Sequence, residues 1–327
     1  MADVFHKMHG LGNDFVVIDG RATPVEMTTA RARAIADRRT GIGCDQLIVI
    51  GPSDHADAQM RIFNADGSEP EMCGNGIRCL ARFLADSDGD GPGRQWQIET
   101  LAGRIVPELQ ADGTIRVDMG APFLEPATIP TTLAVGEAGL PQGQLEAGGI
   151  TFAVGAAGMG NPHVVIPVVD VAAIDLERCG AALEVDPAFP ARTNVHFVQA
   201  LSPTHLVMRV WERGAGPTLA CGTGACATLV VAHRFGLAER RARIDLPGGP
   251  LEIDWDPASD HLFMTGPAVA VFDGVVTPEL WGDDPADVSL DAVPDAVASV
   301  DCASVCVNGC IRPEACPSAE ARARVQA

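Results

Sequence analysis

The 327-residue sequence predicts an α+β fold of two pseudo-symmetric halves, because motifs recur along it at one constant spacing. The Gly-x-Gly-Asn motif that ends at Asn13 recurs at Asn161, 148 residues later. Cys73-Gly-Asn-Gly recurs at the same spacing as Cys221-Gly-Thr-Gly. Matches in a single register are difficult to obtain by chance, and such repeats indicate a duplicated structural unit. We therefore predict two similar halves that face each other across a cleft, with the active site inside it.

Each half is predicted to be a curved, mostly antiparallel sheet wrapped around a central helix. Segments rich in β-branched and apolar residues predict strands over residues 15–19, 46–50, 60–64, 96–100 and 115–119. Apolar residues at helical spacing predict helices over residues 28–39 and 77–85. The second half repeats this order, with strands over residues 164–168, 195–198 and 207–211 and a helix over residues 225–234. Few long helices separate consecutive strands, which argues against a doubly wound parallel sheet.

Three parts are expected along the chain. Residues 1–133 form an N-terminal half-domain that carries Cys73, and residues 134–274 form a C-terminal half-domain that carries Cys221. Residues 275–327 form an acidic linker and a Cys-rich extension of unknown role. Four thiols of this extension could bind zinc or an iron–sulfur cluster, although their spacing matches no common motif: Cys302, Cys306, Cys310 and Cys316. A disulfide-prone or disordered tail is the alternative.

The composition indicates an ordinary globular protein. Hydrophobic residues make up 47% of the chain and charged residues 20%. The formal charge of −20 repels phosphate groups, which argues against nucleic acid and anionic membrane surfaces as partners. No segment has the roughly 18 apolar residues that a bilayer span needs, and the N-terminus lacks the basic and apolar runs of a signal peptide. A cytoplasmic location is therefore expected.

The only lysine, Lys7, argues against pyridoxal phosphate as a cofactor. Enzymes that use this cofactor need a lysine for the Schiff base, and Lys7 follows no recognisable phosphate-binding loop. Chemistry at a carbon acid is therefore expected to proceed with no cofactor.

Cys73 and Cys221 are candidate catalytic residues because each precedes a glycine-rich turn and a predicted helix. The glycines allow a tight turn and leave backbone N–H groups uncovered at the start of the helix. These donors and the helix dipole stabilise anions. We therefore predict that the pKa of each thiol falls toward neutrality, and that a substrate carboxylate binds beside the sulfur.

Two thiols on opposite faces of one α-carbon would explain the duplication. Removal of the α-proton of an amino acid needs a placed base and a stabilised carboxylate. A thiolate on one face can remove the proton while a thiol on the other face returns one, which inverts the centre. The remaining cysteines of the two halves are predicted to pack in the core: Cys44, Cys79, Cys179 and Cys226.

The motifs around these residues resemble those of the diaminopimelate epimerase family. The resemblance runs from about residue 5 to residue 274 and rests on residues 8–15, 63–68, 72–76, 160–163, 192–194, 212–216 and 220–224. It implies an isomerase that interconverts LL- and meso-diaminopimelate, a small amino-acid substrate on the path to lysine and peptidoglycan. The chain departs from the family pattern at residues 70–72 and at Trp211, where tyrosine is common. We interpret Trp211 as a packing change.

The resemblance also implies roles for single residues. Cys73 and Cys221 would be the base and acid pair. The backbone groups that hold the carboxylate of the reacting centre would be those of Gly74, Asn75, Gly222 and Thr223. The residues that bind the non-reacting end would be Asn64, Asn161, Asn194, Glu212 and Arg213, with Arg213 on the carboxylate and Glu212 on the ammonium. Asn13 and Gln46 would line the same pocket.

Several alternatives stay open. Glu212 and Arg213 could pair with each other at the surface, and His163 beside Asn161 is the kind of lone histidine that is usually structural. A related two-cysteine racemase would act on proline, hydroxyproline or histidine, which lack a second amino-acid end. A cysteine hydrolase would use Cys221 with His163 and leave the duplication unexplained. A metal-binding or redox protein would act through its tail. The sequence also leaves open whether the protein forms a homodimer.

Overall fold

The computed structural model describes residues 4–281, and Phe5–Gly274 form one compact unit. The described ends of the chain belong to a separate unit, which contains the short helix α5 (Pro278–Trp281). The predicted acidic linker and the cysteines Cys302, Cys306, Cys310 and Cys316 lie outside the described residues. No helix within residues 4–281 is long and apolar enough to cross a membrane.

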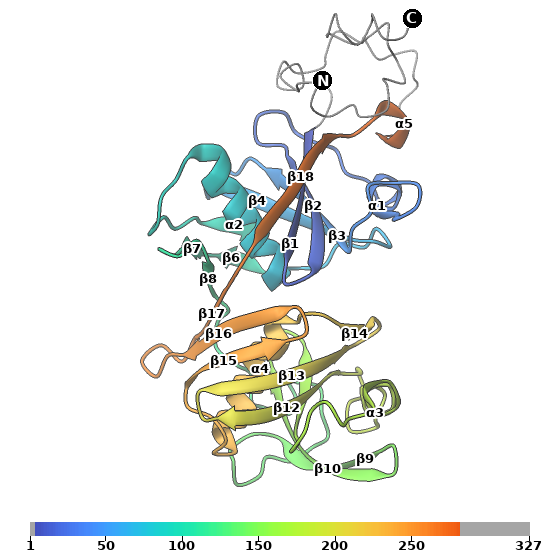
Figure 1. Ribbon diagram of the computed structural model, residues 1–327, viewed down its shortest axis with the longest axis vertical. Coiled ribbons are helices and arrows are strands. Elements are labelled where there is room, and N and C mark those ends of the chain that lie inside the picture. The colour runs from blue at the N-terminus through green and yellow to red at the C-terminus, as the bar shows by residue number, and fades with distance from the viewer. Residues whose placement is uncertain (1–3, 282–327) are drawn as a thin grey trace, which may run out of the picture. The chain divides into compact units, whose positions relative to one another are not determined.

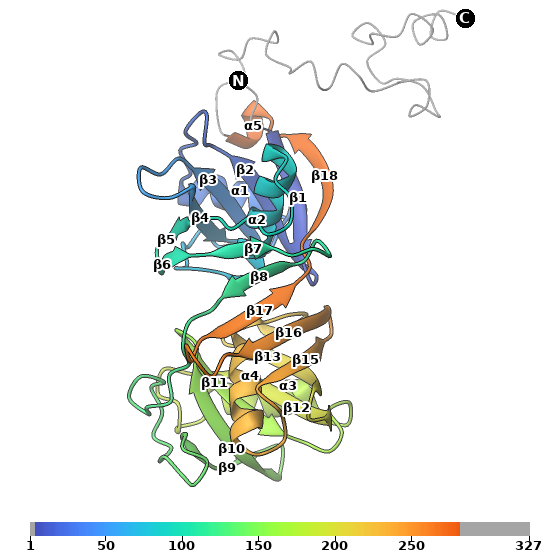
Figure 2. The same ribbon diagram turned by 90° about the vertical axis from the view of Figure 1, so that its left-hand side faces the viewer.

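The strands form two mixed sheets (Figures 1 and 2). The 7-stranded sheet has the order β18-β1-β2-β3-β4-β5-β6. Its strands are β1 (Val4–Gly10), β2 (Asn13–Asp19), β3 (Gln46–Gly51), β4 (Ala58–Asn64), β5 (Ile98–Thr100), β6 (Gly103–Ile105) and β18 (Val269–Val275). The pairs β1/β2, β3/β4 and β5/β6 are antiparallel, whereas β2/β3 and β4/β5 are parallel.

The 11-stranded sheet has the order β7-β8-β17-β16-β15-β13-β12-β11-β10-β9, and β14 pairs with β13. Its strands are β7 (Pro107–Leu109), β8 (Ile115–Asp118), β9 (Gln142–Ala147), β10 (Ile150–Gly158), β11 (Pro162–Pro167), β12 (Asn194–Ser202), β13 (His205–Glu212), β14 (Gly216–Thr218), β15 (Arg241–Leu246), β16 (Gly249–Trp255) and β17 (Leu262–Gly266). Its parallel pairs are β11/β12 and β13/β15. The prediction of two mostly antiparallel sheets is thus confirmed.

The repeat in the sequence is also a repeat of strand register. Phe15 of β2 pairs with Gln46 of β3, and 148 residues later His163 of β11 pairs with Asn194 of β12. The helices repeat as well: α1 (Thr29–Ala36) and α2 (Gly74–Asp88) correspond to α3 (Leu176–Glu184) and α4 (Gly222–Arg234). Helix α3 is the one of these four that sequence periodicity did not predict.

Each half also contributes strands to the sheet of the other. Strands β7 and β8 come before residue 133 but pair into the larger sheet, whereas β18 comes late in the chain and lies beside β1 at the edge of the smaller sheet (Figure 1). The boundary near residue 133 stays a prediction. The chain therefore passes from one sheet to the other more than once.

Helices α2 and α4 lie at the centres of two hydrophobic cores. In α2, Ile77 and Leu80 are fully buried against the 7-stranded sheet, and in α4 Leu229 and Val230 are fully buried against the larger one. Full burial of such a side chain contributes about 1.5–3 kcal/mol, so both helices are held firmly. Cys44, Cys79, Cys179 and Cys226 are buried free thiols, as predicted.

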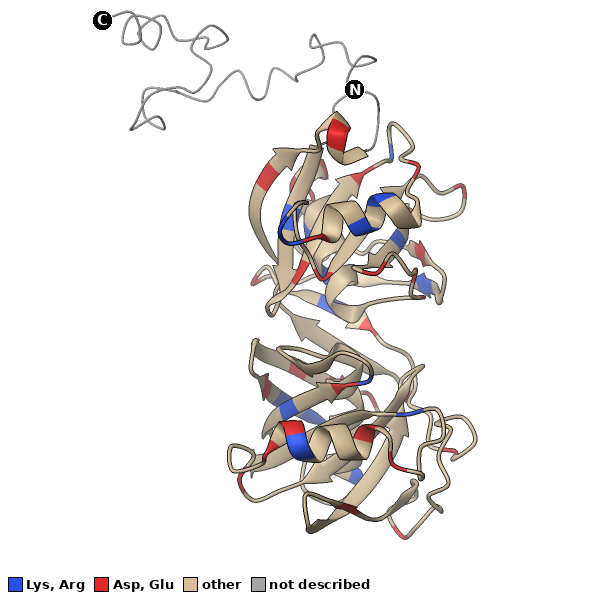
Figure 3. Ribbon diagram, turned by 90° about the vertical axis from the view of Figure 1, so that its right-hand side faces the viewer, with Lys and Arg blue, Asp and Glu red and all other residues tan. Residues whose placement is uncertain are grey.

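Charged residues lie mainly outside these cores. Acidic and basic positions are interspersed over loops, helices and outer strands in the view of Figure 3. Arg78 of α2 and Glu184 of α3 are exceptions, and the side chain of Arg78 is fully buried. Its guanidinium donates to the carbonyl oxygens of Gly74 and Pro267 and to Oδ1 of Asn75.

Leu80→Ala should reduce the free energy of unfolding by about 2–5 kcal/mol, because it opens a cavity beneath α2. Leu101→Ala is the matched control: Leu101 is 64% exposed, so its truncation should cost less than about 0.5 kcal/mol. Urea denaturation followed by circular dichroism measures both. Equal losses for the two variants would contradict the assignment of α2 as a core helix.

Candidate active site

The two candidate cysteines occupy the same position at the start of the two central helices. Cys73 is the N-cap of α2 (φ −137°, ψ 121°), and Cys221 is the N-cap of α4 (φ −134°, ψ 105°). Ile77 N donates to Cys73 O and Ala225 N donates to Cys221 O, each at 2.9 Å. Neither helix has a side-chain cap, so first-turn N–H groups remain for another acceptor.

The two helix N-termini approach each other closely. A Cβ added to Gly222 would lie 2.8 Å from Sδ of Met264 and 3.9 Å from the Cα of Gly74. A Cβ added to Gly74 would meet the Met264 methyl group at 3.0 Å. A side chain at either glycine would therefore displace the end of the Met264 side chain, which lies between the two helix starts.

A pocket of about 1000 Å³ opens at this junction and contains both cysteines. It is lined by all but one of the predicted catalytic and substrate-binding residues: Asn13, Gln46, Asn64, Cys73, Gly74, Asn75, Asn161, Glu212, Arg213, Cys221, Gly222 and Thr223. The unusual segment at residues 70–72 lines it too. Residues predicted from both halves of the sequence thus share one pocket.

Asn194 is the exception, because it does not line the pocket. Its side chain is 4% exposed. Nδ2 donates to the carbonyl oxygen of Pro162, and Oδ1 accepts from the backbone N–H of Arg213, both at 2.9 Å. The predicted contact of Asn194 with substrate is not supported by this placement. Both ends of its amide are engaged in holding the backbone that carries Arg213.

Amide groups and a buried guanidinium surround Cys73. Its Sγ lies 3.8 Å from Oδ1 of Asn13, which also accepts from Nδ2 of Asn75 at 3.2 Å. Arg78 in turn donates to Oδ1 of Asn75 at 2.9 Å, and Asn13 donates to Asp45 at 3.0 Å. The orientation of each amide is set by this chain of hydrogen bonds, which begins at Arg78.

The predicted fall in thiol pKa is wrong for the protein without substrate. Burial raises the pKa of Cys73, although backbone N–H groups of Gly76 and Asn75 act in the opposite direction. Burial raises the pKa of Cys221 further, and the negative charge of Glu212 adds to the effect. Loss of hydration destabilises a thiolate more than one helix terminus stabilises it. The protonated form of both thiols is therefore favoured.

Glu212 and Arg213 project into the pocket from the end of β13 and the turn after it. Within residues 4–281 no ion pair joins the two side chains, which argues against the alternative that Glu212 and Arg213 pair with each other. Glu212 accepts from Oγ1 of Thr218, and burial raises its pKa. Arg213 donates from Nη1 to the carbonyl oxygen of Ala191 at 3.1 Å. Both charges face the pocket.

A pair of buried histidines lies behind this wall of the pocket. His163 Nε2 is 2.7 Å from Oδ1 of Asn161, and His163 Nδ1 is 2.8 Å from Nε2 of His196. Burial lowers the pKa of His163 well below its usual value and that of His196 to about 3, so both rings are neutral at pH 7. A neutral His163 that donates to Asn161 must accept from His196. Because Oδ1 of Asn161 is engaged, its amide N–H groups are left for the pocket.

Several residues of the site were missed in the sequence. Asp45 and Arg38 line the pocket and form an ion pair at 2.6 Å, and Thr218 contacts Glu212. His196 had a usable signal, because alternate residues of a strand share one face and it follows Asn194 by two. Trp211 is a packing residue as predicted: it lies against Gly180 of α3, and its indole donates to Glu184 at 2.7 Å.

Lys7 does not line the pocket. Its ammonium pairs with Asp14 and donates to the carbonyl oxygen of Gly43, and its side chain is 11% exposed. A Schiff base at Lys7 would break this buried ion pair. The thiols of Cys73 and Cys221 do line the pocket and can act on a carbon acid instead.

The chain is similar to known proteins along most of its length. A family model described as diaminopimelate epimerase matches residues 5–124 and 155–271. "Diaminopimelate epimerase" of Prochlorococcus marinus (strain MIT 9313) is 55% identical over 282 residues, covering 84% of this chain and 93% of the relative. "Diaminopimelate epimerase 1" of Nostoc sp. (strain PCC 7120) is 54% identical over 278 residues, covering 84% of this chain and 99% of the relative.

Solved structures share the fold at low sequence identity. A hydroxyproline epimerase from Agrobacterium vitis superposes with a TM-score of 0.61 at 17% identity, over 84% of this chain and 91% of that one. A Bacillus anthracis protein of the PhzF family, from phenazine biosynthesis, gives a TM-score of 0.59 at 18% identity, over 85% and 99%. These likenesses establish the fold, whereas the family match and the relatives above 50% identity establish kinship. The chain belongs to the diaminopimelate epimerase family.

Proposed function

We propose that the chain interconverts LL- and meso-diaminopimelate without a cofactor, using Cys73 and Cys221 as its base and acid. The observation that carries this proposal is the placement of the two thiols at matching helix N-termini on one pocket that also contains Glu212 and Arg213. The identity of the substrate is inferred from the names of the relatives. The product belongs to the precursors of lysine and peptidoglycan.

The helix starts provide the stabilisation that α-proton removal needs. The carboxylate of the reacting centre binds the first-turn N–H groups at Gly74, Asn75, Gly222 and Thr223, where both helix dipoles favour negative charge. Charge that develops on the carboxylate during proton removal meets donors already in place, so little reorganisation is needed. One thiolate removes the proton, and the opposite thiol protonates the carbon from the other face.

The surroundings of the two thiols favour Cys73 as the resting base. Burial raises the pKa of Cys73 most and the charge of Glu212 adds to this effect, whereas backbone N–H groups and the positive charge of Arg78 lower it. Burial and the charge of Glu212 hold the pKa of Cys221 higher. The pair therefore starts with Cys73 as the more acidic thiol and Cys221 as the proton donor. Turnover in the reverse direction exchanges the two roles.

The distal end of the substrate is bound by the wall formed by β13. Arg213 binds its carboxylate and Glu212 its ammonium, each by a charge-assisted hydrogen bond. Asn161 adds an N–H donor for the carboxylate, because its Oδ1 accepts from His163. Gln46 donates to Oδ1 of Asn64 at 2.8 Å and so orients that amide at the opposite wall. Asn194 acts through the backbone of Arg213.

The rival activities fit these contacts less well. Proline, hydroxyproline and histidine have no second amino-acid end, so they would leave the carboxylate of Glu212 and the exposed guanidinium of Arg213 without a substrate partner. A hydrolase that uses Cys221 with His163 would need a ring nitrogen free to accept the thiol proton. Both nitrogens of His163 are already engaged.

We also propose that the protein works in a reducing compartment such as the cytoplasm. The mechanism needs both thiols in the reduced form, and thiols persist where glutathione and thioredoxin act. A homodimer stays a prediction that gel filtration with light scattering would test.

Reduced protein incubated with LL-diaminopimelate in deuterated water should yield meso product with one deuterium. Cys73→Ala and Cys221→Ala should each lower the rate by roughly 100-fold or more, because each removes an acid–base group. Cys79→Ala and Cys226→Ala are matched controls in the same two helices and should stay within a few-fold of the parent. Chiral chromatography with mass detection measures stereochemistry and label. Full turnover in either catalytic-cysteine variant would refute the two-base mechanism.

Iodoacetamide should label Cys73 several-fold faster than Cys221 in the substrate-free protein, as measured by peptide mass spectrometry. The thiolate is the reactive form, so labelling of Cys73 should rise about tenfold per pH unit until its raised pKa is reached. Glu212→Gln should speed labelling of Cys221, because it removes the charge that raises the pKa of that thiol. Glu252→Gln, on an exposed position of β16, is the control. Faster labelling of Cys221 in the parent would reverse the assignment of base and acid.

Arg213→Met should lower kcat/KM for diaminopimelate by roughly 10-fold or more, since a hydrogen bond to a charged group contributes about 1.5–3 kcal/mol. Arg243→Met is the control, because Arg243 is half exposed on β15 and pairs with Asp245. Proline should not be a substrate of either protein. Proline turnover above that of diaminopimelate would assign the chain to the racemase alternative.

A further inference from the structure

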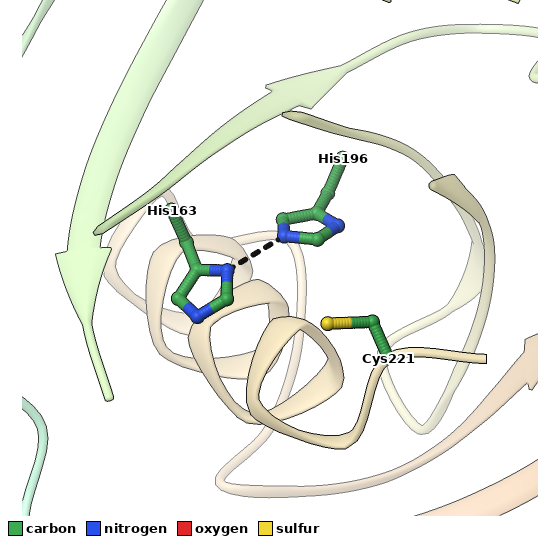
Figure 4. A group of neighbouring side chains, drawn as sticks. All are labelled: His163, His196 and Cys221. Atoms are coloured by element: carbon green, nitrogen blue, oxygen red, sulfur yellow. Dashed lines mark hydrogen bonds between the residues drawn. The ribbon is translucent and has the colours of Figure 1, made fainter. Parts of the chain in front are cut away.

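His163, His196 and Cys221 form a compact buried group behind the pocket (Figure 4). One ligand atom from each residue can be chosen so that all three lie within 4.8 Å of one another. The two histidines are fully buried, and Cys221 is 5% exposed. Figure 4 shows the sulfur facing the two rings, which are joined by a hydrogen bond. In the proposed mechanism the thiol of this group reacts and His163 orients Asn161, whereas His196 has no role.

The absence of a side chain at position 224 keeps this space open. A Cβ on Gly224 would lie 2.3 Å from Cε1 of His196, 2.8 Å from its Nε2 and 3.0 Å from Sγ of Cys221. Any larger residue would therefore fall between the sulfur and the nearer nitrogen. The glycine that frees the start of α4 also lets the imidazole approach the thiol.

The polar groups of this cluster are not all satisfied. His196 Nδ1 has no hydrogen-bond partner within residues 4–281, although the ring is completely buried. A buried imidazole nitrogen without a partner is costly. The proton between the rings can move, since His196 can carry its single N–H on either nitrogen. Movement of that proton to Nδ1 leaves Nε2 of His196 and Nδ1 of His163 with lone pairs beside the sulfur.

We propose that His163, His196 and Cys221 form a binding site for a thiophilic divalent cation such as Zn²⁺, which inhibits the enzyme by occupying Cys221. Imidazole nitrogen and thiolate sulfur are the ligands that Zn²⁺ prefers, and three protein ligands with one open position are common. In a tetrahedral site with ordinary Zn–N and Zn–S bond lengths, the ligand atoms lie about 3.3–3.6 Å apart. Small shifts of the three side chains would therefore bring all three ligand atoms onto one cation. The inference goes beyond the epimerase activity.

Charge and protons also balance in this site. Binding of the cation releases the Cys221 thiol proton to solvent, while the His196 proton moves from Nε2 to Nδ1. The cation, the thiolate and the nearby carboxylate of Glu212 then sum to zero net charge, which lowers the cost of burial. The metal-bound sulfur carries no proton to donate and shares its negative charge with the cation, which makes it a weak base, so epimerisation stops. A chelator reverses the inhibition.

The test uses the full chain with Cys302, Cys306, Cys310 and Cys316 changed to Ser, so that thiols of the extension do not compete. Reduced protein is titrated with Co²⁺ and then with Zn²⁺ in competition. One equivalent of Co²⁺ should give a thiolate-to-metal charge-transfer band. The band is measured without turnover, so a missing band can be distinguished from missing epimerase activity.

Two inactive variants form the matched pair. Cys221→Ser should lose the band, whereas Cys73→Ser should keep it. His196→Gln should weaken Co²⁺ binding by more than the roughly 10–100-fold that loss of a second-shell partner costs, and it should weaken Zn²⁺ inhibition in parallel. His233→Gln, at the far end of α4, should change neither. A band that persists in Cys221→Ser, disappears in Cys73→Ser, or is indifferent to His196→Gln would overturn the proposal.

Discussion

The contact between the N-termini of α2 and α4 is the constraint on which the site depends. Gly74 and Gly222 approach each other around the end of the Met264 side chain, and this brings two N-cap cysteines to one pocket. Each helix is fixed by its own hydrophobic core. The separation of the thiols is therefore set by packing of both halves, and a change in either core would move one sulfur relative to the other. A site of this kind forms only when both halves are folded.

The duplication is the part of the structure that the sequence predicts best. Constant spacing relates strands as well as motifs: the pair Leu47 and Phe63 in β3/β4 recurs as Val195 and Trp211 in β12/β13. A site residue found in one half thus indicates its counterpart in the other. Short edge strands and α3 were not predicted, because a few residues carry too little periodicity. The inward or outward placement of Asn194 depends on backbone partners at Pro162 and Arg213 that are distant in sequence.

The thiol pKa values show how local and tertiary effects compete. A helix N-terminus stabilises an anion, and that argument is visible in the sequence. The degree of burial is not, because it depends on both halves closing around the pocket. At Cys221 burial and Glu212 together outweigh the helix dipole. A raised pKa also has a chemical use, since a thiolate formed at that cost is a stronger base toward a weakly acidic carbon.

The two halves have diverged at the positions that surround the thiols. Arg78 corresponds by the repeat spacing to Cys226, and Asn64 corresponds to Glu212. His163 and His196 correspond to the apolar residues Phe15 and Ile48. The N-terminal half thus adds a buried cation near its cysteine, whereas the C-terminal half adds a carboxylate and two neutral imidazoles. The fold presents two equivalent thiols, and these substitutions make them inequivalent. They also place the charged residues that bind the distal end of the substrate in the C-terminal half alone. A substrate with two identical ends is therefore held in a single orientation relative to the base, which is what a reaction confined to one of its two centres requires.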